Sequence, residues 1–103
     1  MELTTAHKTR IVDFLDRYLD ENDVGHGEEV GICEVGYIAT EMNIGTEDVV
    51  ATVEIMTDKD IQGMSKPYLI RIFGEVHIVI CVQNSYADKK YRLQDIRPNV
   101  RGV

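Results

Sequence analysis

Residues 34–60 read EVGYIATEMNIGTEDVVATVEIMTDKD, and this stretch decides the fold. Apolar side chains recur at helical spacing over residues 34–42 and stop at the link Asn43-Ile44-Gly45. Asn and Gly tolerate turn and left-handed conformations, so the link predicts a tight turn. Thr46 can cap a second helix whose first turn carries Glu47 and Asp48, where carboxylates complement the helix dipole. The stretch therefore predicts two short helices set at an angle.

The segment after the turn has a second interpretation. Its apolar residues share a helical face, but Val49, Ala51, Val53 and Ile55 also alternate with the period of a strand. The Thr-Glu-Asp start is typical of a helix, and we therefore predict a helix over residues 46–60. Its outward face would carry Glu47, Ala51, Glu54 and Asp58.

The residues before this stretch predict a longer helix and a short strand. Apolar side chains from Ile11 to Leu19 recur at i, i+3, i+4, i+7 and i+8, which predicts a helix from about residue 5 to 21. Thr4 or Thr5 could cap it, and His7 would be solvated on its first turn. A Gly-rich loop over residues 23–29 then leads to a short strand over residues 30–33.

The C-terminal part is β-patterned. Residues 68–73 and 76–82 predict two strands joined by Gly74-Glu75 in a type II′ turn, a register that pairs Phe73 with Val76 and Arg71 with Ile78. The second of these strands is apolar on both faces, so we expect it to be central and covered. Residues 83–88 predict a polar loop, residues 90–94 a third strand, and the tail from about residue 97 irregular structure.

Length and composition predict one α+β domain spanning residues 1–103. The chain is 44% apolar, which suits one modest core. The absence of any apolar run of roughly 18 residues and of an apolar N-terminal segment predicts a cytoplasmic protein without a membrane partner. Cys33 and Cys81 are expected to be free thiols. The residues expected to be buried are Phe14, Leu15, Tyr18, Ile38, Val53, Ile70, Val79 and Ile80.

The formal charge of −7 is unevenly distributed. Residues 1–65 contain 15 Asp and Glu against four Lys and Arg, whereas residues 66–103 contain three against seven. A net acidic protein repels polyphosphate at long range, but the basic C-terminal third could still contact phosphates locally.

Catalytic and metal-binding patterns do not emerge from the sequence. His7, His26 and His77 are far apart and lack the spacing of a zinc site. Ser65 and Ser85 lack the Gly-x-Ser-x-Gly context of a nucleophile elbow. We therefore expect no enzyme, no catalytic residue, no metal and no cofactor.

Helix, short strand, helix, turn, helix and hairpin is an order of elements that resembles the winged-helix superfamily, over roughly residues 5–82. The resemblance implies three helices with a small antiparallel sheet and a hairpin wing. It also implies a DNA-associated transcriptional regulator, whose third helix enters the major groove while the wing touches the backbone. Here that helix would present Glu47, Glu54 and Asp58, and the wing tip Gly74-Glu75, which argues against base reading. The alternative is a winged-helix protein-interaction module without nucleic-acid binding.

The resemblance leaves the partner open. DNA would have to bind through the basic C-terminal third; otherwise the partner is a protein, and a homodimer is compatible with either. The resemblance also implies that Cys33 and Cys81 lie on neighbouring strands with Cα atoms ~5 to 7 Å apart. The candidate nucleic-acid-binding residues are Lys66, Arg71, Lys89, Lys90, Arg92 and Arg97.

Overall fold

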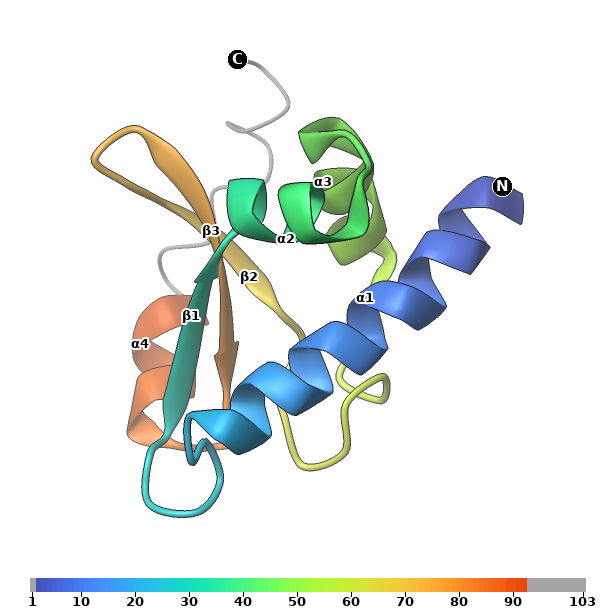
Figure 1. Ribbon diagram of the computed structural model, residues 1–103. Coiled ribbons are helices and arrows are strands. Elements are labelled where there is room, and N and C mark those ends of the chain that lie inside the picture. Colours follow the sequence, from blue (N-terminus) through green and yellow to red (C-terminus); the bar gives the residue numbers. More distant parts are fainter. Residues whose placement is uncertain (1, 93–103) are drawn as a thin grey trace.

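The computed structural model describes residues 2–92, which form four helices and three strands (Figure 1). In chain order these are α1 (Glu2–Glu21), β1 (Val30–Glu34), α2 (Val35–Met42), α3 (Thr46–Ile55), β2 (Tyr68–Ile72), β3 (Glu75–Cys81) and α4 (Tyr86–Arg92). The strands form one antiparallel sheet in the order β1-β3-β2. The α+β class is thus confirmed, with one helix more than the three predicted.

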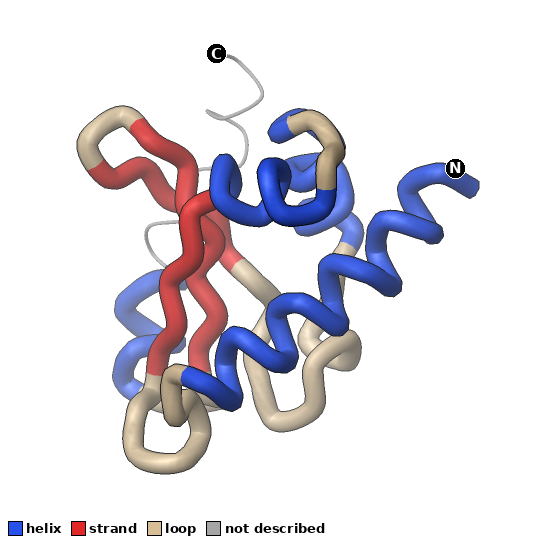
Figure 2. The backbone as a smooth tube through the Cα atoms, viewed as in Figure 1, coloured by secondary structure: helices blue, strands red, loops and turns tan. Residues whose placement is uncertain are grey.

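The sheet separates two apolar clusters of different size. Ile78 and Ile80 of β3 join a large cluster with residues of α1, α2 and α3, whereas Val79 and Cys81 join a small one with Ala87 of α4. Successive side chains of a strand point to opposite faces, so α4 covers the face that the other helices leave open (Figures 1 and 2). The prediction that β3 is central and apolar on both faces is confirmed.

Helix α1 lies along the large cluster and approaches β1 closely. A Cβ atom on Gly31 would lie 2.7 Å from Cδ2 of Leu19, so the glycine permits this packing. The Tyr18 hydroxyl donates a hydrogen bond of 2.6 Å to the carbonyl of Ile32. Tyr18 and Phe14 are half-buried at the margin of the core rather than fully buried as predicted. The other six residues predicted to be buried are buried.

Two predictions for the first helix need correction. The helix begins at Glu2, three residues before the predicted start. His7 is 9% exposed, so the prediction of a solvated histidine is wrong. Its neighbour Lys8 forms an ion pair of 2.9 Å with Asp60, which ties the first turns of α1 to the segment after α3.

Helices α2 and α3 confirm the two-helix prediction for residues 34–60. Asn43 ends α2 in the left-handed region, with φ 57°, as its position in the link suggested. Helix α3 is a helix rather than a strand, but it ends at Ile55 instead of residue 60. Beyond it, the Asp60 carboxylate accepts a hydrogen bond from the backbone N–H of Thr57, and such local side-chain contacts compete with the helix.

The β2–β3 hairpin differs from the predicted register. Ile72 pairs with Glu75 and Arg71 with Val76, so the two-residue turn is Phe73-Gly74 rather than Gly74-Glu75. Both turn residues have positive φ, 51° and 84°, as a type I′ turn requires. Types I′ and II′ both match the strand twist, and one glycine satisfies either. The sequence pattern therefore did not separate the two registers.

The predicted proximity of Cys33 and Cys81 is wrong, although β1 and β3 do pair. Cys33 lies opposite Ile78 and Cys81 opposite Val30, so the two cysteines are three positions apart along the ladder. Three positions correspond to roughly 10 Å and place the side chains on opposite faces of the sheet. Both residues are buried free thiols, as expected.

Helix α4 replaces the polar loop and the third strand predicted after residue 82. The hydroxyl oxygen of Ser85 accepts a hydrogen bond of 3.1 Å from the backbone N–H of Asp88, which caps the helix. Ala87 and Tyr91, four residues apart, pack on the sheet. The alternation read over residues 90–94 was therefore misleading up to Arg92, while residues 93–103, including the predicted irregular tail, lie outside the described range.

Candidate functional site

A groove of about 620 Å³ lies between α3 and the β2–β3 hairpin. Its helical wall comes from α3 and the start of α2, and its other wall from the hairpin. Apolar side chains are exposed within it even though the core beneath is closed. The lining residues are Val35, Gly36, Thr46, Glu47, Val50, Ala51, Glu54, Arg71, Gly74, Glu75 and Val76.

The groove is acidic on both walls. Glu47 and Glu54 stand on α3, and Glu75 stands at the start of β3. Among the described residues that line it, Arg71 is the one basic side chain, and its guanidinium donates a hydrogen bond of 3.4 Å to the carbonyl of Gly74. An apolar floor between carboxylates repels phosphate and favours a ligand that is both apolar and cationic.

Phe73 forms the tip of the hairpin and is 102% exposed. A bulky side chain at positive φ is a backbone outlier that costs roughly 1 to 2 kcal/mol. The φ of Phe73 is 51°, and no burial of its ring offsets this cost. Such a combination of strain and exposure marks the tip as a candidate contact residue.

The predicted nucleic-acid-binding residues do not form one surface. Lys66 and Arg92 line a hollow of about 690 Å³ beside the loop before β2, where Asp58 and Asp88 also lie. Lys66 donates a hydrogen bond of 3.0 Å to the carbonyl of Met56, just beyond the C-terminus of α3, where a cation complements the helix dipole. Both of these cations thus lie beside carboxylates or carbonyls of the protein itself.

The remaining candidates lie on separate faces. Lys89 and Lys90 are exposed on α4, on the far side of the sheet from α3. Arg71 lines the acidic groove on the other side. Arg97 lies outside the described residues. The structure therefore brings Lys66 and Arg92 together but joins neither Lys89 nor Lys90 to the exposed face of α3.

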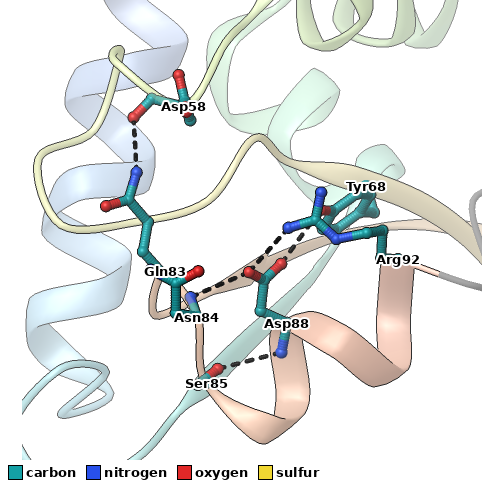
Figure 3. A network of polar contacts seen from close by, with 7 residues as sticks. All are labelled: Asp58, Tyr68, Gln83, Asn84, Ser85, Asp88 and Arg92. Atoms are coloured by element: carbon teal, nitrogen blue, oxygen red, sulfur yellow. Dashed lines mark hydrogen bonds and ion pairs between the residues drawn. The ribbon is translucent and has the colours of Figure 1, made fainter.

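Asp88 is the centre of a buried polar network that fastens α4 to the sheet (Figure 3). It is 1% exposed and accepts hydrogen bonds of 3.1 Å from the Tyr68 hydroxyl, the Asn84 backbone N–H and the Arg92 guanidinium. Burial alone would raise the pKa of Asp88, but these bonds, one from the Ser65 side chain and the charge of Arg92 outweigh burial and lower it. This saturated carboxylate has a structural role.

The two thiols are chemically quiet. Burial, reinforced by nearby Glu34, raises the pKa of Cys33 to about 11. Burial, with Asp88 and Glu29 nearby, raises the pKa of Cys81 to about 12. A thiol is nucleophilic as its thiolate, so neither cysteine is an activated nucleophile.

Two further searches cover residues 2–92. They contain no group of three His, Cys, Asp or Glu side chains placed to hold a metal ion. None of the described helices combines the length and apolarity needed to cross a membrane.

Comparison of the chain with protein-family models, curated proteins and solved structures finds no match. The candidate site therefore rests on geometry. Sequence reasoning found the acidic outer face of α3 but missed the opposing wall and Phe73. The pair Phe73-Gly74 between two strands was the available signal, because a type I′ turn needs two residues at positive φ.

Proposed function

We propose that this chain is a winged-helix-like protein-interaction module of the cytoplasm, without enzymatic activity, and that it binds its partner in the groove between α3 and the hairpin. The order of elements supports the winged-helix assignment, with α4 as an addition. The observation that carries the function is the groove itself, which has apolar side chains between carboxylates on two walls. Such a surface suits a protein segment better than a phosphate backbone.

A DNA-associated regulator is the second candidate, and one observation favours it. Lys89 and Lys90 are exposed side by side on α4, free of the carboxylates that surround the groove. DNA bound there would contact the face of the sheet opposite to α3. Docking would then differ from the usual insertion of the third helix into the major groove.

A photo-crosslinker on the groove separates the two candidates. Ala51→Cys places an exposed thiol on α3, and it should react selectively because both native thiols are buried with raised pKa values. In extracts of cells that express the protein, we expect adducts that protease removes and nuclease leaves intact. Thr46→Trp, which fills the groove, should abolish them.

The matched control carries the crosslinker at Tyr86→Cys on α4, a position that is 77% exposed in the native protein. It should give few adducts. Nuclease-sensitive adducts at this position, with none at Ala51→Cys, would reverse the order of the two candidates.

Duplex binding at two salt concentrations tests the second candidate directly. If DNA binds through α4, Lys89→Glu with Lys90→Glu should weaken binding and flatten its salt dependence, because each phosphate contact releases counterions. Glu54→Gln should leave binding unchanged or strengthen it. Loss of binding on Glu54→Gln, with both lysine variants silent, would show instead that α3 reads bases.

A further inference from the structure

We propose that the occupant of the groove is a basic amphipathic segment of a partner protein, and that Phe73 is the apolar anchor that holds it. This inference rests on the proposed interaction function and adds the chemistry of the partner. It follows from the charge of the groove, the character of its floor and the conformation of the hairpin tip.

The charge of the groove determines the sign of the partner. Glu47 and Glu54 on one wall face Glu75 on the other, against the single cation Arg71 among the lining residues that the structure describes. Arg71 also donates a hydrogen bond to the carbonyl of Gly74, which holds its side chain against the hairpin. A segment with Lys or Arg along its edges would find a carboxylate on either side.

The floor of the groove determines the rest of the partner's chemistry. Val35 belongs to the closed core, but Val50 and Val76 are half-buried and Ala51 is exposed, so apolar surface remains open between the acidic walls. Burial of such surface supplies most of the affinity of an interface, while the charges supply orientation and selectivity. A partner that is merely cationic would leave this floor wet.

Phe73 supplies an independent observation at the end of the groove. It directly precedes Gly74 and Glu75, which line the hairpin wall, and its ring is fully exposed. Asn-Gly is the preferred pair for a type I′ turn, so Asn in place of Phe would relieve strain at this position. The chain instead keeps an aromatic ring there, and aromatic side chains are the commonest anchors of protein interfaces.

Phe73→Asn therefore separates binding from stability. We expect the melting temperature to rise by roughly 4 to 8 °C, because relief of strain stabilises a domain of this size by about that much. Affinity for the partner segment should fall at least about tenfold, because an anchor is lost. A destabilised protein could lose binding trivially, but a stabilised one that loses binding has lost a contact. Tyr86→Asn on α4 removes another exposed aromatic ring and should leave binding unchanged.

The probe is a fluorescent Leu/Lys peptide of about 14 residues with Leu at helical spacing, long enough to span the ~15 Å of α3. Its counterpart carries Glu in place of Lys. We expect the Leu/Lys peptide to bind in the micromolar range and to dissociate as salt rises, and the Leu/Glu peptide not to bind. Because the whole protein is acidic, charge-matched variants are needed to locate the binding.

Glu75→Lys and Asp16→Lys change the net charge equally but at different places. Glu75 lines the groove, whereas Asp16 is exposed on α1 away from it. Glu75→Lys should weaken the Leu/Lys peptide about tenfold and Asp16→Lys by much less. Equal effects of the two variants, equal binding of the two peptides, or an unchanged affinity in Phe73→Asn would each overturn the inference. Protein adducts at Ala51→Cys without peptide binding would also overturn it, while leaving the proposed interaction function standing.

Discussion

Replacing Leu15 or Ile80 by Ala should lower the free energy of unfolding by roughly 2 to 5 kcal/mol. Both side chains are at most 2% exposed and belong to the large cluster, Leu15 from α1 and Ile80 from β3. Truncation removes buried methyl groups and leaves a cavity that rigid neighbours on two elements cannot fill. The loss should appear as a lower denaturant midpoint with an unchanged slope.

Two variants serve as controls for the core prediction. Asp16→Ala changes an exposed position next to Leu15 and should stay within about 0.5 kcal/mol of the native protein. Ile80→Val removes one methyl group and should cost about 0.5 to 1.5 kcal/mol. If Leu15→Ala behaved like Asp16→Ala, α1 would contribute little to the core, contrary to its packing against Gly31.

The helix pair and the central strand were predictable because their signals are local. Asn43 and Gly45 interrupt one helical pattern, and Thr46 begins the next, so the turn can be located without tertiary information. Strand β3 carries apolar side chains at successive positions, which already implies cover on both faces. Neither inference needed a contact between distant residues.

Helix α4 was not predictable from hydropathy because its contact with the sheet is largely polar. Asp88 is buried yet charged, and its hydrogen bond to Tyr68 joins residues 20 positions apart. A hydropathy pattern assigns such a residue to the surface. The sequence Ser85-x-x-Asp88 resembles a helix start, but its meaning depends on a partner that one-dimensional patterns do not reveal.

The candidate site was half predictable for a related reason. The acidic face of α3 follows from helical periodicity, whereas the opposing wall depends on hairpin register. Register is set jointly by turn type and strand pairing, and Phe73 at positive φ is a choice that turn preferences disfavour. The pairing of β1 with β3 was likewise foreseen, but the offset between Cys33 and Cys81 was not. Positions where local preference fails are where functional constraints are expected.

Asp88→Asn should detach α4 from the sheet at neutral pH and cost about 2 to 3 kcal/mol, the usual range for hydrogen bonds to a buried charge. The amide keeps the shape of the carboxylate but removes the charge that Arg92 neutralises, and it offers one acceptor oxygen in place of two. The C-terminal part of the chain should then become sensitive to protease before the rest unfolds. Tyr68→Phe, which removes one donor and leaves the carboxylate in place, should cost about 1 kcal/mol.

The contribution of Asp88 should also depend on pH with a defined sign. Its pKa is lowered in the folded protein, so the unfolded chain binds the proton more readily as pH falls. The stabilisation is fully present above the unfolded pKa of about 4 and is lost as pH falls through the lower folded value. The difference in unfolding free energy between the native protein and Asp88→Asn should therefore be constant from about pH 6 upward and shrink below about pH 4. Asp60, whose pKa is also lowered, is common to both proteins and cancels from the difference. A difference that grew on acidification would mean that Asp88 is protonated in the fold, and that the bonds from Tyr68, Asn84 and Arg92 do not hold a carboxylate.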